Sequence, residues 1–560
     1  MADQVFPITF KPGILRDGSP FQGEYCTNGQ WTRFFRGFPQ NIGGMTTLPH
    51  TEDPIKASAI SSALYIDQQE AAPSIFIGFS APYYVTSKNR NYSLAVFTGN
   101  NGSWDSPQPL EYNKIGFEGA YWQIVPIIFQ SGPESKRSIL CVPRLIANIT
   151  NSNAVPIIWN YSNGSFVEVT TMMVEKQETK YSELLKEMTG GVLFINPYLF
   201  IYGNNGLVRW SKSRVNVTAD KPFKFDILKY SINISTDKVI YGAGVRGGTA
   251  SPSALFWTLS SVVRLTNIGS VNPDDVDDIS FKKEIITNDS SILSSNCVVE
   301  YDGIFYWPGT GRFFTYNGVV VPLENNLNRQ TFFENVDMNK RQLVFGVKNT
   351  VKDEIWWFYP EKGNADDVGC TRAVIYNIMD NSWYDTAVMR DCGYFDNVTG
   401  NMFTVGKNLV PYEGDTDNYI WQHEVGTDQV NNNYPNDNPL KPPIKAIPSY
   451  FTTPIISYAS FNNFKQPSGI DRWMQIKRIE PNFVFTPTAN MSIIFNSQQY
   501  PLSPVVSSVP LPVSTAPDKP ARVEFMFQGR NVSFTFRSQG LGSGYQMSQT
   551  FVVADVGDGR

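Results

Sequence analysis

Short apolar and aromatic runs alternate with turn-forming residues along most of this chain, from about residue 55 to residue 425. The segment Gly191–Gly203 predicts strand, turn and strand, and Asn204–Gly206 then supplies an Asn-Gly turn before the strand Leu207–Ser211. Runs of about four to six residues between Asp-Gly, Asn-Gly and Asn-Asn turns predict up-and-down meanders and not βαβ units. The same texture recurs at 298–307, 313–321, 343–347, 354–359, 372–376 and 382–384.

Successive meanders of this kind expose sheet edges, and radial repetition is one way to cover them. We therefore predict an all-β fold with a β-propeller-like body over residues 51–425. The repeat has no strict period, so the number of blades stays open. Helix is expected in only two places, Thr179–Met188 and Asn325–Glu334, and the first carries the stronger signal.

The two ends of the chain differ from this body. Residues 1–50 interleave aromatic residues, arginines and glycines, which predicts an extended N-terminal arm that docks on another surface. Residues 426–449 are rich in Asn, Asp and Pro and predict a linker or loop. Beyond them every second residue is apolar in Val523–Phe527 and Val532–Arg537, as in a sheet with one buried face. Residues 450–560 therefore predict a C-terminal β-sandwich-like region, or sheet that completes the main body.

Composition agrees with large buried or interfacial sheet surfaces. Aromatic residues make up 14% of the 560 residues and charged residues only 17%, against about 25% charged residues in typical domains. The net charge of −5 argues against a chain that grips nucleic acid along its surface, because that affinity comes mainly from Lys and Arg on phosphates. It leaves open a chain that surrounds nucleic acid, since a mildly acidic wall would let a polyanion slide.

The five cysteines, Cys26, Cys141, Cys297, Cys370 and Cys392, are widely spaced. No C-x-x-C pair occurs, so neither a zinc site nor a redox motif is expected. Free buried thiols in a reducing compartment are the favoured interpretation, with one disulfide between Cys370 and Cys392 as the alternative. The first residues lack the basic and apolar regions of a secretory signal, and no apolar stretch approaches the ~18 residues that span a bilayer.

Catalytic chemistry has little raw material in this sequence. His50 and His423 are the only two histidines, too few for a Ser-His-Asp triad or a His-rich metal site. His423-Glu424 also lacks the second histidine of a zinc-protease helix, so we expect His423 to be structural or on the surface. A carboxylate pair for glycoside hydrolysis stays open among the 51 acidic residues. We expect no cofactor, no metal and no enzymatic activity.

Other segments resemble known motifs without matching them. Asn272–Asp278 is acidic but lacks the Gly and distal Glu of an EF-hand, which favours a solvated acidic loop. Gly242–Gly248 has neither the spacing of a phosphate-binding loop nor a surrounding βαβ pattern, which favours a strand junction. Asp302-Gly303 and Asp415–Asp417 are expected in turns.

The N-terminal pattern Gly13-Ile-Leu-Arg-Asp-Gly18, Trp31-Thr-Arg-Phe-Phe-Arg-Gly37 and Ile42-Gly-Gly44 resembles that of tail proteins from short-tailed, double-stranded DNA bacteriophages. These are the podovirus tail hub or nozzle proteins of the packaged-DNA stabilisation type. Further segments agree in the same order along the chain, namely Asn196–Gly203 with Gly206–Ser211, Tyr419–Gly426 and Val556–Arg560.

The resemblance implies a structural virion protein that is made in the host cytoplasm and located in the phage tail. Its β-propeller-like body would assemble as a ring, usually of six copies, below the portal and adaptor. The implied partners are its own copies in a homo-hexamer, neighbouring tail proteins such as the adaptor ring, fibres or needle, and genomic double-stranded DNA that passes without specific contacts. The ring would line the DNA channel, retain packaged DNA and conduct it during ejection, without a membrane anchor.

A closed ring needs contacts between different faces of neighbouring subunits, and aromatic and Arg residues are enriched in interfaces. The predicted arm offers Trp31, Arg33, Phe34, Phe35 and Arg36 as interface candidates. We expect Trp31→Ala or Arg33→Ala to impair assembly and leave the body folded. The alternative hypotheses are a propeller-type glycan-binding or polysaccharide-degrading protein and a receptor-binding fibre, although the chain lacks the repeat-rich shaft of a fibre.

Overall fold

A computed structural model shows that the chain consists almost entirely of strands. It describes residues 4–48, 55, 61–68, 73–85, 90–100, 103–104, 108–111, 120–131, 134–145, 156–160, 165–168, 173–174, 189–212, 224–225, 230–245, 253–270, 279–364, 369–433, 443–458, 472–486, 489–500, 503–514 and 521–556. Within these residues, no helix has both the length and the apolar character needed to cross a bilayer.

Seven sheets of the described chain surround one cavity as the blades of a β-propeller. The first strands of six blades line that cavity, together with the residues just before the first strand of the fifth blade. The first strand of the seventh blade also packs against the first strand of the first blade, which closes the ring. The β-propeller-like body is therefore confirmed, and the described residues form seven blades, a number that the degenerate repeat could not give.

The first six blades are antiparallel sheets built from strands that follow one another in the sequence, except that β21 lies outside the third blade. The first contains β8 (Ser61–Asp67), β9 (Ser74–Val85), β10 (Arg90–Asn100), β11 (Ser103–Trp104) and β12 (Gln108–Glu111). The second contains β13 (Ala120–Ser131), β14 (Glu134–Leu145), β15 (Ile157–Asn160) and β16 (Ser165–Glu168), and the third β18 (Gly191–Ile195), β19 (Tyr198–Tyr202), β20 (Leu207–Trp210) and β22 (Ser231–Asn233). The fourth contains β23 (Val239–Gly244), β24 (Ser253–Thr258), β25 (Val262–Ser270) and β26 (Ile279–Thr287). The fifth contains β27 (Val299–Tyr301), β28 (Ile304–Pro308), β29 (Phe313–Tyr316) and β30 (Val320–Leu323), and the sixth β31 (Phe345–Asn349), β32 (Glu354–Tyr359), β33 (Cys370–Asn377) and β34 (Ser382–Arg390).

The seventh blade combines strands from both ends of the propeller sequence. Its first three strands are β35 (Cys392–Asp396), β36 (Asn401–Gly406) and β37 (Tyr419–His423), and the fourth is β7 (Met45–Thr47) from the N-terminal segment. β7 pairs antiparallel with β37 and parallel with β38 (Asp428–Val430), which in turn pairs with β39 (Ile444–Ala446). A strand from the start of the chain therefore completes the last blade and ties the two ends of the propeller sequence together.

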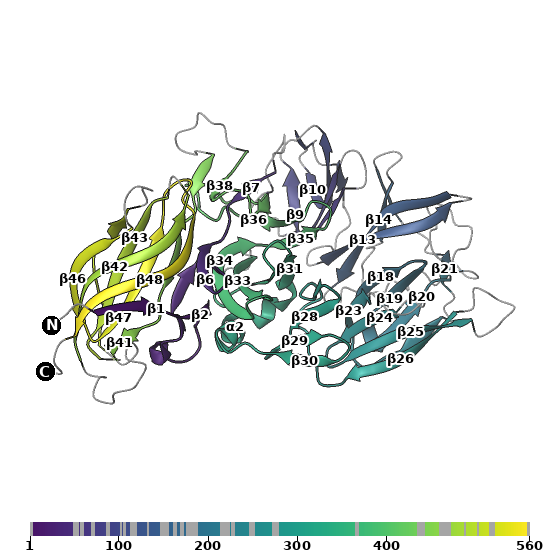
Figure 1. Ribbon diagram of the computed structural model, residues 1–560. Helices are drawn as coiled ribbons and strands as arrows, with labels where there is room; N and C mark the ends of the chain where they lie inside the picture. The colour runs from purple at the N-terminus through teal and green to yellow at the C-terminus, as the bar shows by residue number, and fades with distance from the viewer. Residues whose placement is uncertain are drawn as a thin grey trace.

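The C-terminal region forms a β-sandwich of two sheets, as its alternating pattern predicts. One sheet contains β46 (Val523–Gly529), β42 (Met474–Phe485), β48 (Tyr545–Val556), β6 (Phe38–Asn41), β5 (Thr32–Phe35) and β1 (Gln4–Ile8). The other contains β4 (Asn28–Gln30), β40 (Ser449–Thr452), β41 (Ile456–Ser457), β47 (Asn531–Ser538), β43 (Met491–Gln498), β44 (Val506–Ser507) and β45 (Leu511–Val513). Figure 1 shows the yellow sandwich strands at one end of the molecule, with both termini on that side and the propeller on the other.

A few short elements complete the described fold. Parallel pairs form between β2 (Lys11–Ile14) and β3 (Tyr25–Cys26), and between β17 (Met173–Val174) and β21 (Lys224–Phe225). The helical elements are η1 (Pro20–Gln22), η4 (Asn204–Gly206), α2 (Arg329–Asn335) and η5 (Met338–Leu343). The helix expected at Asn325–Glu334 is therefore present as α2 with shifted bounds, whereas Thr179–Met188 lies outside the described residues.

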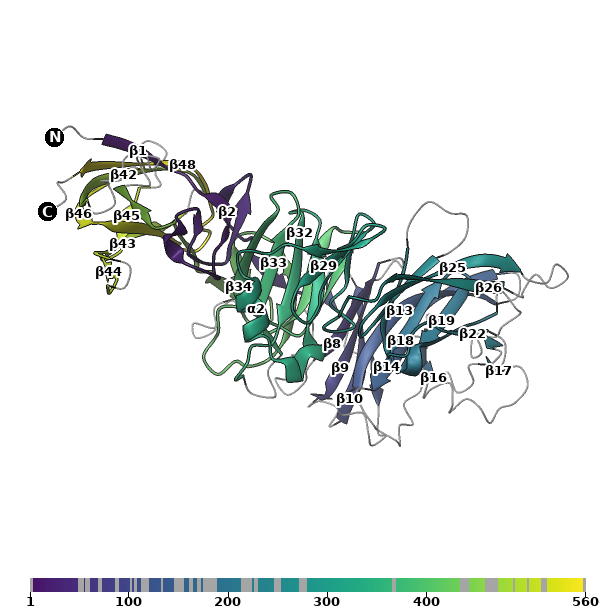
Figure 2. The same cartoon turned by 90° about the horizontal axis from the view of Figure 1, so that it is seen from below.

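The N-terminal segment is extended, as predicted, but it is not an arm apart from the body. Its strands belong to both sandwich sheets and to the seventh blade, and Figure 2 shows β2 between the sandwich and β34. The predicted linker 426–449 likewise contains β38 and β39, although residues 434–442 lie outside the described residues. These segments pair within the chain because their backbone groups and apolar side chains find partners in its own sheets.

A single cluster of buried residues joins the N-terminal segment, the last two blades and the sandwich. Trp31, Phe34, Ile42 and Met45 from the N-terminal segment pack there with residues of β32, β33, β37, β43 and β47. All five cysteines are buried and free, which confirms the interpretation as unpaired thiols over the Cys370–Cys392 disulfide.

Trp31→Ala is expected to lower the free energy of unfolding by about 3–5 kcal/mol, because it empties the space of a tryptophan that is 1% exposed. Denaturant unfolding of the whole chain measures this change. Phe35→Ala, four residues along the same segment and 40% exposed, is the control and should cost less than about 1 kcal/mol. Equal unfolding midpoints for Trp31→Ala and the wild type would contradict this packing.

Candidate functional site

The hairpin β5–β6 and the residue before it lie against the sixth and seventh blades. The Trp31 backbone N–H donates to Thr386 Oγ1 on β34 at 3.1 Å, and the Trp31 ring meets the edge of the Trp356 ring on β32 at 6.3 Å between centroids. The Phe34 ring lies 5.8 Å from that of Tyr384. Trp31 and Phe34 are therefore core residues of this chain, and their side chains offer no surface to a neighbouring subunit.

Arg33 is buried between two carboxylates. Its Nε atom lies 2.9 Å from Glu354 Oε1 on β32, and its guanidinium donates to both oxygens of Glu424, which follows β37 directly. Tyr384 and Trp356 donate further hydrogen bonds to Glu354 at 2.5 and 2.8 Å. Arg33 therefore joins the N-terminal segment to the sixth and seventh blades through one buried ion cluster.

The pKa values of the two carboxylates are shifted in opposite directions, because burial and charge are balanced differently around each of them. Burial raises the pKa of Glu354, and this effect outweighs the attraction of Arg33. Burial also acts to raise the pKa of Glu424, but the charge and hydrogen bonds of Arg33, with Lys352 nearby, bring it below its ordinary value. Both carboxylates are committed to Arg33 and closed to solvent or nearly so, so the pair does not form an accessible acid and nucleophile of a glycosidase.

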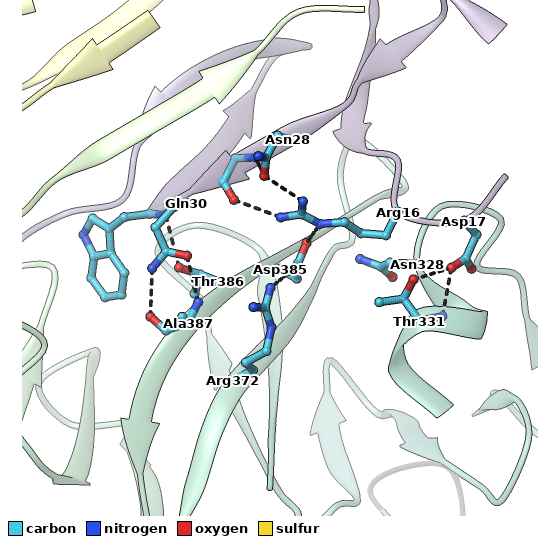
Figure 3. Close-up of polar contacts among 12 residues, drawn as sticks. Arg16, Asp17, Asn28, Gln30, Asn328, Thr331, Arg372, Asp385, Thr386 and Ala387 are labelled. Carbon is cyan, nitrogen blue, oxygen red and sulfur yellow. Dashed lines mark hydrogen bonds and ion pairs between the residues drawn. The ribbon is translucent and has the colours of Figure 1, made fainter. Parts of the chain in front are cut away.

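A second set of polar contacts fixes the first part of the N-terminal segment on β34 (Figure 3). Arg16 Nε lies 2.8 Å from Asp385 Oδ1, and Arg372 on β33 pairs with the same carboxylate. Gln30 forms two hydrogen bonds with the backbone of Ala387, each 2.9 Å long. The contacts of Arg16 and Gln30 link residues more than 350 positions apart and hold β4 beside the sixth blade.

Asp17 supplies the cap that α2 lacks locally. Its carboxylate accepts from the backbone N–H groups of Gln330 at 2.6 Å and Thr331 at 2.8 Å, as Figure 3 shows for Thr331. Asn328, at the start of the helix, makes no capping hydrogen bond with its side chain. The first N–H groups of a helix favour an anionic acceptor. Arg16 and Asp17 of the Gly13–Gly18 motif therefore anchor the N-terminal segment to the sixth blade and to α2.

The tip of the β5–β6 hairpin is exposed at the surface. Phe35 and Phe38 are directly opposite each other and are 40% and 37% exposed. The turn between them places Arg36 at φ 50° and Gly37 at φ 83°, a left-handed pair in which Asn-Gly is the common choice. The Arg36 guanidinium lies 5.3 Å from the centre of the Phe35 ring.

The structure thus divides the five interface candidates into two groups. Trp31, Arg33 and Phe34 are buried inside this chain, so the prediction that their side chains contact another subunit is corrected. Their apolar and charged groups find complementary partners in β32, β34 and Glu424, which a sequence alone does not place beside them. Phe35 is exposed at the hairpin tip beside Arg36, and these two remain interface candidates.

His423 is a structural residue, as expected. It is 2% exposed, and its Nε2 atom lies 2.7 Å from Thr404 Oγ1 on β36. Burial, reinforced by the charges of Arg390 and Arg33, holds its pKa well below the ordinary 6.5. The other histidine, His50, lies outside the described residues.

A cavity of about 490 Å³ lies at the centre of the propeller ring. Arg144 is the one charged side chain among the described residues that line it. Arg144 donates to Asn296 Oδ1 at 2.9 Å, and Asn296 Nδ2 donates to the Ser62 carbonyl at 3.2 Å. Gln123 exchanges two hydrogen bonds with the backbone of Val192. These polar side chains connect different blades across the cavity.

The remaining sequence motifs take structural positions or fall outside the described residues. Asp302-Gly303 forms the left-handed turn between β27 and β28, as expected. The first part of Gly242–Gly248 belongs to β23, whose residues line the cavity, and residues 246–250 are outside the described part. Asn272–Asp278 also falls outside it. Among the described residues no group of three or more His, Cys, Asp or Glu side chains could hold a metal ion.

Sequence analysis missed Glu354 of the buried ion cluster and Arg144 of the central cavity. Glu354 opens a strand whose residues are all buried, so a carboxylate in the otherwise apolar run Glu354–Tyr359 was the available signal for a buried partner. Arg144 carried no such signal, because its place in the central cavity depends on how separate blades meet.

Comparisons with known proteins add little to this geometry. No family model matches the chain, and no curated protein matches its sequence. A solved structure of BBS1N in complex with ARL6DN, soaked with lead, has 9% sequence identity over 68% of this chain and 98% of that chain, with a TM-score of 0.34. A glycoside hydrolase structure has 10% identity over 88% of this chain and 99% of that chain, with a TM-score of 0.27. At such TM-scores neither likeness carries information about function.

Arg33→Met is expected to reduce the free energy of unfolding by about 3–5 kcal/mol, because it leaves Glu354 and Glu424 buried without their counter-charge. Denaturant unfolding at neutral pH measures the loss. Arg36→Met is the matched control on the same hairpin and should change the free energy by no more than about 0.5 kcal/mol. A similar, small effect of both substitutions would contradict the role of the ion cluster.

His423→Gln is expected to weaken the acid sensitivity of the fold. Below the ordinary pKa of 6.5 the unfolded imidazole takes up a proton that the buried imidazole does not, so the free energy of unfolding falls as pH decreases. From pH 6.5 to 5.5, the free energy of unfolding should fall less steeply in the variant than in the wild type. The difference in slope should be up to about 1.4 kcal/mol per pH unit. Unfolding at a series of pH values tests this, and parallel curves down to pH 5.5 would refute it.

Proposed function

We propose that this protein is a structural subunit of the short tail of a double-stranded DNA bacteriophage and assembles through contacts between its own copies into a ring. The resemblance of the N-terminal motif to podovirus hub or nozzle proteins motivates this proposal. Most of that motif secures the chain's own fold, so the part left for contacts between subunits is the hairpin tip. The ring would retain packaged DNA and conduct it during ejection.

The observation that carries the proposal is the exposed tip patch, defined here as Phe35, Arg36, Phe38 and Met379. The Gly37 N–H donates to Asp380 Oδ2 at 3.4 Å, so the tip lies against the β33–β34 turn, where Met379 is 76% exposed. Aromatic, Met and Arg side chains are those enriched in interfaces. Arg36 also adopts a left-handed backbone conformation, which is unfavourable for an arginine. Residues in such unfavourable conformations cluster at functional sites.

The proposal places DNA between subunits and not through one propeller. The described cavity holds about 490 Å³ and is crossed by hydrogen-bonded side chains of several blades. The major groove of a DNA duplex is by itself about 12 Å wide, so a whole duplex is too large for a cavity of this volume. A conduit for double-stranded DNA therefore requires several copies around a common axis, which agrees with the implied ring of six.

The oligomeric state of the purified chain tests the proposal directly. Native mass spectrometry and light scattering of the purified chain should detect a six-membered ring. The double variant Phe35→Asp with Phe38→Asp should associate at least about tenfold more weakly, because it puts charges into an apolar contact. Val398→Asp is the matched control, since Val398 is 71% exposed on the turn between β35 and β36.

Two outcomes would overturn the proposal. One is a wild-type chain that stays monomeric at every concentration and is absent from phage particles. The other is polysaccharide turnover by the purified chain, which would favour the alternative of a polysaccharide-degrading propeller. If the tip double variant and Val398→Asp both assemble normally, the ring contact lies elsewhere on the surface.

A further inference from the structure

A small second pocket of about 50 Å³ lies beside the central cavity of the propeller. Arg144 lines both spaces. The other residues important here are Lys238, which precedes β23, and Tyr121, Ser295 and Gln342. The pocket therefore brings together residues of the second blade, the residue before β23 of the fourth blade, the loop before the fifth blade and η5, which precedes the sixth blade.

Arg144 is a buried cation with unused hydrogen-bonding capacity. It is 6% exposed and donates one hydrogen bond, to Asn296 Oδ1 at 2.9 Å. Its Nε atom is buried and has no partner. No ion pair joins Arg144 to a carboxylate among the residues that the structure describes, although buried guanidinium groups normally have one.

A glycine makes room for this arginine. Gly191 has φ +129°, and a Cβ atom there would lie 2.4 Å from Gln123 Oε1 and 3.3 Å from Arg144 Cδ. Any larger residue at this position would strain the backbone and crowd both side chains. The local structure of β18 therefore allows Arg144 to reach the two spaces.

Lys238 adds a second positive charge at the same pocket. It is half-buried, and no hydrogen bond or ion pair involves its ammonium group in the described structure. Burial lowers its pKa, and the charge of Arg144 lowers it further. Burial likewise lowers the pKa of Arg144. Two neighbouring cations repel each other, and with no ion-paired anion among the described residues they favour a negatively charged ligand.

We propose that this pocket binds a small oxyanion of the size of inorganic phosphate, held by Arg144 and Lys238. One ordered water needs about 10–15 Å³ of such space, so about 50 Å³ accommodates an ion with several oxygens. The hydroxyl groups of Tyr121 and Ser295 and the amide of Gln342 carry further donors along the lining. The bound ion would neutralise both cations and tie the second, fourth and fifth blades together.

Calorimetric titration of the full chain with sodium phosphate tests the site, with sodium chloride at matched ionic strength as the control for screening. We expect saturable one-to-one binding of phosphate and a rise in melting temperature with phosphate concentration. Lys238→Met should weaken binding at least about tenfold, and Arg144→Met should weaken it further. Lys282→Met, an exposed lysine of β26, should bind as the wild type does.

Phosphate heats equal to those of chloride would overturn the proposal, as would unchanged affinity in Lys238→Met. Circular dichroism shows whether Arg144→Met folds. If it does not, Lys238→Met decides alone, because Lys238 is half-buried and its ammonium group has no hydrogen bond or ion pair in the described structure.

Discussion

The buried ion cluster of Arg33 with Glu354 and Glu424 is the interaction on which the arrangement of this protein depends. It joins the N-terminal segment to two different blades, with Arg33 and Glu354 buried and Glu424 partly exposed. A buried charge without its partner is strongly unfavourable, so the ion pairs of Arg33 with both carboxylates hold the hairpin β5–β6 in its place. Around that position Trp31 and Phe34 fill the core, and a few residues further on β7 completes the seventh blade.

This constraint separates the roles of residues that look alike in the sequence. The first aromatic and arginine residues of the segment hold the fold together, and the hairpin tip with Phe35 and Arg36 remains available for contacts. The central cavity has a different character, because its polar side chains bridge blades and its one described charge is a cation. Assembly and ligand binding, as proposed, would thus use separate surfaces of a rigid β-structure.

The fold class could be predicted from short alternating runs and Asp-Gly or Asn-Gly turns, because these patterns are local. The Asp302-Gly303 turn and the alternation in Val532–Arg537 are two examples that the structure bears out. The fate of Trp31 and Arg33 could not be predicted, since an aromatic-arginine pattern is equally suited to a partner's surface and to a distant sheet of the same chain. What decides between them is Glu354, more than 300 residues away. The proximity of Arg144 and Lys238 could not be predicted either, because the two residues belong to different blades that come together only in the folded propeller.

Amide hydrogen exchange of the isolated subunit tests the central claim, that the N-terminal segment is part of the subunit's own core. The account predicts that amides of β5, β6 and β7 exchange as slowly as those of β32 and β33 before any assembly occurs. Rapid exchange of β5 to β7 in the isolated subunit, with protection only after subunits associate, would contradict it and restore the segment to the role of an arm for a neighbour.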